Sequence, residues 1–281
     1  MRLSVCDYSF PLLPHDQVCR LARMLDFDAL DLGLMGNRSH VRPEAIRGSA
    51  RKMARPLKRK LERMQLNVAD VFLIPWTDFE TLAVNHPDAS VRAQSRSLFD
   101  DALAFADELG AAGITTLPGI EWPNEPPDAG FQRAVEELEW RSNRAQENGL
   151  RFSIEAHLGS IVEDPAEVPR LLDAVSSMTL AFDITHFIYQ GYRQRSLVPL
   201  AAHAGHVHVR GARPGRMQVG AAENEVDYDC LLESLRSVGY NAYVACEYVW
   251  VDWERCNECD NLSETIMLRD RVREFIDGAS S

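Results

Sequence analysis

Eight short apolar runs alternate with longer segments of helical periodicity along the 281-residue chain. A strand that is repeatedly followed by a helix builds a parallel sheet, because the helix returns the chain to the same end of the sheet. No composition break, Pro-rich linker or low-complexity segment interrupts the series. We therefore predict an α/β fold in which residues 1–281 form a single domain, one (β/α)8 TIM barrel.

The predicted elements follow in strand–helix order. Strands are expected at residues 3–6, 28–34, 67–73, 114–117, 151–157, 180–186, 206–210 and 242–248. Helices are expected at residues 16–25, 42–64, 91–109, 130–148, 165–175, 198–203, 227–238 and 262–276. The turn after the first strand has no glycine, and neither a Gly-x-Gly-x-x-Gly nor a P-loop sequence occurs. A doubly wound dinucleotide-binding sheet is therefore disfavoured.

Polar residues that ligate metals lie near the ends of the last four runs. They are Glu155, Asp183, Glu247 and the pair His206 and His208, whose two-residue spacing puts both imidazoles on one face of a strand. Active sites of such barrels lie at the C-terminal ends of the strands. Three carboxylates and one imidazole suit a single divalent cation, with Mn²⁺ expected first and Mg²⁺, Co²⁺ or Zn²⁺ also accommodated. The pattern predicts a metal site but leaves open which histidine binds.

The charge and composition of the chain indicate which classes of molecule it can bind. The formal net charge is -12, with 46% hydrophobic and 26% charged residues. An acidic globular chain disfavours nucleic acid, whose binding needs clustered cations. No apolar run reaches the length of a membrane span, and the first strand begins too early to leave room for a signal peptide. We expect a cytoplasmic enzyme that acts on a small molecule, and leave a homo-oligomer open.

Two local features have ordinary explanations. Residues 51–63 hold seven Lys or Arg, but the spacing of Met53, Leu57, Leu61 and Met64 indicates an amphipathic outer helix. Cys256 and Cys259 form a lone Cys-x-x-Cys without a second pair or a thioredoxin-like context. We interpret them as free thiols near a helix start.

The order of the polar residues carries a resemblance that covers essentially the whole chain. Glu in the fifth strand, Asp183-Ile-Thr-His186 in the sixth, His206-Val-His208 in the seventh and Glu in the eighth resemble the sugar phosphate isomerase/epimerase family. That family has a xylose-isomerase-like barrel and includes ketose 3-epimerases and hydroxypyruvate isomerases. The resemblance implies that Glu155, Asp183, His208 and Glu247 bind one metal ion. It further implies that Glu155 and Glu247 exchange protons with substrate and that His186 hydrogen-bonds a substrate oxygen.

This division of labour is chemically coherent. A cation that bridges carbonyl and hydroxyl oxygens stabilises the enediolate formed when a carboxylate removes the neighbouring proton. Return of a proton by a second acid gives an epimerase or an isomerase. Loss of a β-hydroxyl from the same enediolate gives a dehydratase, of the inosose or dehydroshikimate type, which is our alternative.

Candidate substrate contacts come from the loops after the strands. By similarity, Arg213 or Arg216 holds a substrate hydroxyl or an anionic group. The predicted cavity contacts are aromatic, acidic or imidazole side chains: Trp122, Trp250, Glu121 and His157, the last sharing the face of Glu155. Many family members carry an acidic residue shortly after the strand-seven histidine, where this chain has Arg210-Gly-Ala-Arg213-Pro-Gly-Arg216. Three arginines either recognise a carboxylate or phosphate or form a solvated loop, so a sugar, polyol or keto acid all remain candidate substrates.

Two other functional classes share this architecture. An abasic-site endonuclease-like barrel needs several zinc ions and extra histidines, whereas the first four strand ends offer Asp7, Asp31 and Asp70. A metal-free scaffold barrel would not need the ligand set. The amount of bound metal distinguishes these functional classes. One ion per chain fits an isomerase or lyase, several zinc ions fit the nuclease, and no metal fits the scaffold.

Overall fold

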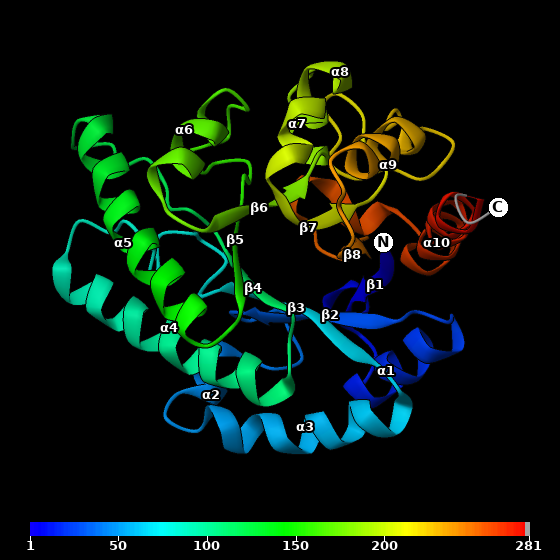
Figure 1. Cartoon of the computed structure of the whole chain (residues 1–281), viewed down its shortest axis with the longest axis horizontal. Helices are drawn as coiled ribbons and strands as arrows, with labels where there is room; N and C mark the ends of the chain where they lie inside the picture. Colours follow the sequence, from blue (N-terminus) through cyan, green and yellow to red (C-terminus); the bar gives the residue numbers. More distant parts are fainter. Residues whose placement is uncertain (279–281) are drawn as a thin grey trace.

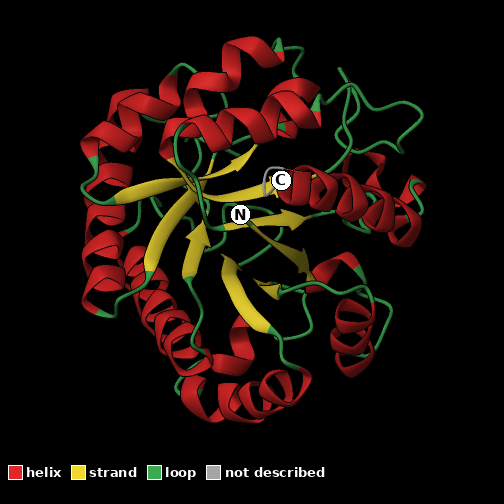
Figure 2. Cartoon of the chain, turned by 45° about the vertical axis from the view of Figure 1, so that its right-hand side comes forward, coloured by secondary structure: helices red, strands yellow, loops and turns green. Residues whose placement is uncertain are grey.

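Eight parallel strands close into a barrel in the computed structural model, which describes residues 1–278. Each strand pairs with the next along the chain, and the first also pairs with the last. Figure 2 shows the strands at the centre with helices around them. The predicted (β/α)8 barrel is confirmed. The strands are β1 (Arg2–Cys6), β2 (Ala29–Met35), β3 (Asn67–Ile74), β4 (Gly113–Thr116), β5 (Arg151–Glu155), β6 (Met178–Asp183), β7 (Ala204–Val209) and β8 (Tyr243–Cys246).

The helices cover the outside of the barrel, and Figure 1 shows α10 beside β1 at the point where the barrel closes. The α-helices are α1 (His15–Met24), α2 (Pro43–Ile46), α3 (Ala50–Met64), α4 (Ala89–Leu109), α5 (Pro127–Glu147), α6 (Glu167–Ala174), α7 (Thr185–Tyr189), α8 (Gln194–Leu197), α9 (Tyr228–Ser237) and α10 (Asn261–Gly278). Three 3₁₀ helices are η1 (Asp7–Ser9), η2 (Val198–His203) and η3 (Trp253–Glu258). Within residues 1–278, no helix has the length and apolar composition needed to cross a membrane.

The long helix predicted at residues 42–64 is two helices. Gly48 separates α2 from α3 with a backbone φ of +60°, in the left-handed region that ends a right-handed helix. The amphipathic face of α3 is confirmed for Leu57 and Leu61, which are 6% and 3% exposed. The prediction that Met53 lies on this face was wrong, because Met53 is 41% exposed.

The strand predicted at residues 180–186 is shorter than expected. β6 ends at Asp183, whose carboxylate accepts hydrogen bonds from the backbone N–H and the hydroxyl of Thr185. An Asp that bonds to the backbone two residues later turns the chain, and α7 begins at Thr185. His186 therefore lies on a short helix rather than on the strand.

The barrel wall separates an apolar shell from a polar interior. Leu30, Leu32 and Leu34 of β2 belong to the main apolar core. The interior instead contains polar side chains that hydrogen-bond across the strands, such as the buried pair Ser4 and Asp31 and the pair of buried Ser153 with half-buried Thr179. This alternation follows the two-residue period of a strand, and it directs the polar groups towards the barrel axis.

Candidate active site

The four predicted metal ligands gather at one end of the barrel. Glu155 and Asp183 are the last residues of β5 and β6, His208 precedes the last residue of β7, and Glu247 follows β8. Pairing sets Asp183 opposite His208 and His208 opposite Ala245. All four are buried, with exposed fractions of 0% to 4%. Parallel strands of matched register thus bring residues from four βα units to the C-terminal mouth.

Three of these residues fit around one ion. Glu155 Oε1 lies 3.0 Å and Glu247 Oε1 lies 3.5 Å from His208 Nδ1. The three ligand atoms lie within 4.8 Å of one another. Ligand atoms of one Mg²⁺-sized ion are roughly 3 to 4 Å apart, given bonds of about 2.1 Å. Glu247 Oε2 is also buried without a hydrogen-bond partner among the described residues, which suits a carboxylate built to hold a cation.

Asp183 has a different environment. Its Oδ1 accepts the Thr185 donors, and its Oδ2 lies 2.8 Å from a terminal nitrogen of Arg210. The same Arg210 nitrogen lies 3.7 Å from Glu247 Oε2. Burial opposes ionisation, but Arg210 and His186 outweigh it and lower the pKa of Asp183. Within residues 1–278, no three-residue group with metal-binding geometry includes Asp183.

His186 and His157 form one wall beside the carboxylates. His186 Nδ1 accepts the backbone N–H of Leu158 at 3.2 Å, so the ring proton belongs on Nε2. That Nε2 lies 3.4 Å from Asp183 Oδ2 and 3.8 Å from Glu155 Oε2, with no hydrogen-bond partner among the described residues. Burial lowers the pKa of both His157 and His186. His186 is therefore a neutral donor aimed at the site.

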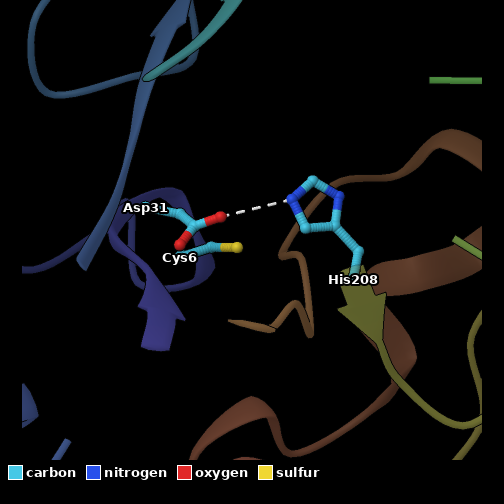
Figure 3. A group of neighbouring side chains, drawn as sticks. All are labelled: Cys6, Asp31 and His208. Carbon is cyan, nitrogen blue, oxygen red and sulfur yellow. Dashed lines mark hydrogen bonds and ion pairs between the residues drawn. The ribbon is translucent and has the colours of Figure 1, made fainter. Parts of the chain in front are cut away.

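Asp31 of β2 supports His208 from below. Figure 3 shows its carboxylate and the Cys6 thiol facing the His208 ring. Asp31 Oδ2 lies 3.3 Å from His208 Nε2 and 2.5 Å from His206 Nε2. Burial disfavours ionisation, but the two histidines outweigh it and lower the pKa of Asp31. With Nε2 held by a carboxylate, His208 Nδ1 is directed at Glu155 and Glu247.

Cys6 lies near Asp31 and His208, and these three residues form another group with metal-binding geometry. Burial raises the pKa of its thiol well above the usual range, and only the thiolate is a good ligand. All six cysteines are free thiols, including Cys256 and Cys259, as predicted.

Sequence reasoning did not assign a role to Tyr8. Tyr8 lies on the short helix η1, and its hydroxyl donates a hydrogen bond of 2.9 Å to Glu247 Oε1. The only sequence signal was its place directly after the first strand. Arg210 was noted as part of an arginine-rich loop, yet its 4% exposure excludes a solvated position.

Burial also affects the ionisation of Glu155 and Glu247. It raises the pKa of both carboxyl groups, while His208 counteracts the shift. A carboxyl group with a raised pKa gives up and takes back a proton more readily near neutral pH.

A cavity of about 600 Å³ opens above these groups. Glu155, Glu247, His157, His186 and Arg210 line it, whereas Asp183 and His208 lie beneath its surface. The remaining polar or aromatic lining includes Tyr8, Arg38, His40, Arg42, Phe79, Trp250 and Trp253. Its size suits a monosaccharide or a small acid.

The predicted substrate contacts divide into two groups. His157, His186 and Trp250 line the cavity. Trp122 instead donates to Asn85 Oδ1 at 3.3 Å, and neither it nor Glu121 is among the described lining residues.

Arg213 and Arg216 also lie outside the described lining. Arg213 pairs with Glu223 at 3.1 Å, and Arg216 pairs with Glu258 at 2.8 Å. The cationic groups that reach the cavity are Arg38, Arg42 and Arg210 instead.

Comparison with known proteins gives these residues a context. The model of the xylose isomerase-like TIM barrel family matches residues 19–269. The 2-oxo-tetronate isomerase of Pectobacterium atrosepticum is 24% identical over an alignment of 163 positions that covers 55% of this chain. The match spans 61% of the length of that relative.

Solved structures agree in fold. The D-psicose 3-epimerase of Clostridium cellulolyticum H10, solved with D-tagatose, has a TM-score of 0.77 at 14% identity, covering 97% of this chain and 98% of its own. A probable 3-DHS dehydratase from Bacillus anthracis has a TM-score of 0.71 at 14% identity. The match covers 96% of this chain and 99% of the dehydratase. Identities this low establish the shared barrel and nothing finer.

Proposed function

Because this chain belongs to the family of xylose isomerase-like TIM barrels, we propose that it is a sugar isomerase or epimerase that depends on one divalent metal ion. It moves a proton next to the carbonyl of a small sugar or keto-polyol. The 2-oxo-tetronate isomerase and the D-psicose 3-epimerase support this reaction class. The cavity volume of about 600 Å³ supports a substrate of that size.

One observation carries the proposal. Glu155 and Glu247 are buried carboxylates on the cavity floor, and both approach the same nitrogen, His208 Nδ1, at 3.0 Å and 3.5 Å. Moving a hydrogen between the faces of a carbon, or between neighbouring carbons, needs one group that removes a proton and one that returns it. We assign these two roles to Glu155 and Glu247.

The metal would be held by Glu155, His208 and Glu247, with Asp183 as the fourth predicted ligand. When bound, a divalent cation neutralises the charge that develops on the carbonyl and hydroxyl oxygens of the substrate. Mixed carboxylate and imidazole ligands favour Mn²⁺, with Mg²⁺, Co²⁺ or Zn²⁺ as alternatives.

Four other side chains complete the proposed site. His186 presents the Nε2 proton of a neutral ring to the cavity, where it would donate to a substrate oxygen. Tyr8 donates to Glu247 Oε1 and so orients this carboxylate. Trp250 and Trp253 line the same cavity and offer apolar surface to the carbon side of the ligand.

Solvent-deuterium exchange tests the proposal. With Mn²⁺ added, the wild-type protein should place deuterium next to the carbonyl of a ketose, sugar phosphate or keto acid. Glu155→Gln and Glu247→Gln should each reduce that exchange by at least about a hundredfold, since each removes a proton-transfer group. Glu108→Gln, which alters a surface ion pair with Arg51, is the matched control. Near-normal exchange in either cavity variant, with an unchanged circular dichroism spectrum, would rule out its role.

A dehydratase is the second candidate. Arg38, Arg42 and Arg210 all line the cavity, which favours an acidic substrate such as a keto acid. The structural likeness to a probable 3-DHS dehydratase is compatible with it. Mass spectrometry of the same incubations separates the two reactions, because a dehydratase product is lighter than its substrate by one water.

A further inference from the structure

Arg210 places a permanent positive charge inside the proposed metal site. It directly follows β7, two residues after His208, so the two-residue period directs it inward like His206 and His208. The side chain is 4% exposed. A guanidinium stays protonated at any working pH, so this cation does not switch off.

The contacts of Arg210 are with the predicted ligands themselves. A terminal nitrogen lies 2.8 Å from Asp183 Oδ2 and 3.7 Å from Glu247 Oε2, and its Nε donates to Thr185 Oγ1 at 3.2 Å. Thr185 in turn donates to Asp183 Oδ1. Both oxygens of Asp183 are therefore engaged by protein donors, which leaves this carboxylate poorly placed to bind an ion.

The remaining candidates are arranged without Asp183. Glu155, His208 and Glu247 converge within 4.8 Å, whereas no such group among residues 1–278 contains Asp183. The two carboxylate oxygens of Glu247 have different neighbours, because Oε1 approaches His208 and Oε2 approaches Arg210. An ion on these three ligands would thus lie within a few ångströms of the guanidinium and would be repelled by it.

We propose that Arg210 is a built-in cation that removes Asp183 from the metal-ligand set, so that the ion is held by Glu155, His208 and Glu247 alone and more weakly than a four-ligand site would hold it. Asp183 then acts as a positioning residue that anchors Arg210 at the cavity floor. The guanidinium in turn offsets the negative charge of Asp183. This inference rests on the metal site of the proposed function.

Mn²⁺ titration of metal-stripped protein tests the inference without any substrate. Arg210→Met removes the charge and keeps a similar volume, and should tighten Mn²⁺ binding by about tenfold or more because Asp183 is released and repulsion is lost. Arg210→Lys keeps the charge and should stay within about threefold of the wild type. In Arg210→Met/Asp183→Asn the gain should shrink, because only the part due to lost repulsion remains. Unchanged or weaker binding by folded Arg210→Met would overturn the inference.

Arg141→Met is the matched control for removing a buried arginine. Arg141 is 1% exposed, pairs with Glu137 at 3.0 Å and is not among the described residues that line the active-site cavity. It should destabilise the fold but leave Mn²⁺ affinity unchanged. A gain in affinity equal to that of Arg210→Met would show that the gain is non-specific, and would overturn the inference.

Anomalous diffraction from wild-type crystals soaked in Mn²⁺ tests the same inference without any substitution. We expect one Mn²⁺ peak bonded to Glu155, His208 and Glu247, with Arg210 still on Asp183. Mn²⁺ bonded to Asp183, with Arg210 displaced, would overturn this inference while leaving the proposed metal dependence intact. No Mn²⁺ peak at the cavity floor would overturn both.

Discussion

At the scale of single residues, the direction of a side chain was easier to predict than its partner. The two-residue period correctly put Glu155 and His208 inside the barrel, because it depends only on neighbours along the strand. It said nothing about Asp31, which is 177 positions from His208 and meets it only when the barrel closes. Arg210 faces inward by the same period, but its choice of Asp183 depends on the three-dimensional approach of β6 and β7.

Asp31 offers the sharpest test at this scale. Asp31→Asn removes the carboxylate that orients His208 Nε2, and should weaken Mn²⁺ affinity by about 10- to 100-fold, the usual effect of losing such a support. Isothermal titration with Mn²⁺ measures it.

Asp70→Asn is the comparison, since Asp70 is equally buried but pairs with Arg151 at 2.7 Å instead of with His208. Its Mn²⁺ affinity should match the wild type. Equal losses in the two variants would mean that the interior charge as a whole, rather than the support of His208, determines affinity.

At the scale of elements, the number and order of strands followed from the sequence, and their ends did not. Apolar runs bounded by helical segments mark a strand, whereas the end of β6 depends on the Asp183–Thr185 turn. The division of the predicted helix 42–64 depends on one backbone angle at Gly48. A glycine within a helical pattern is ambiguous until that angle is known.

The break between α2 and α3 gives an element-scale prediction. Gly48 has a φ of +60° and open space around its Cα, so the effect of a side chain there is backbone strain alone. Gly48→Ala should lower the free energy of unfolding by about 1 kcal/mol. Gly48→Asn should lower it less, because Asn tolerates this conformation. Urea denaturation compares the three proteins, and an Ala variant as stable as the wild type would contradict the account.

At the scale of the whole molecule, the pH dependence of stability is set partly by a cluster outside the metal site. His15 Nε2 lies 3.2 Å from Asp7 Oδ2, and its ring stacks on His40 at 4.7 Å. Burial lowers the pKa of His15, but Asp7 and Cys19 outweigh it and raise the pKa to about 9. Because the folded pKa is above the unfolded one, protonated His15 stabilises the fold fully below about pH 6.5, and this contribution is lost as the pH rises through about 9.

The matching experiment compares wild type with His15→Asn across that range. The difference in unfolding free energy should be on the order of 1 to 3 kcal/mol at pH 6 and should shrink by pH 9.5. Denaturant titrations at several pH values measure it. A difference that stays constant from pH 6 to pH 9.5 would show that His15 carries no extra proton in the fold.

The pairing of β1 with β8 has a consequence for the order of protein synthesis. Among the eight strands, Arg2–Cys6 leaves the ribosome first and its partner strand Tyr243–Cys246 leaves last. Until β8 emerges, β1 therefore has one unpaired edge, which is the kind of surface on which nascent chains associate wrongly. The proton-transfer pair is completed at the same late moment, since Glu247 directly follows β8. Nascent chains of this protein should thus depend on chaperones until the eighth strand is released, and become independent of them in the same step that assembles the active site.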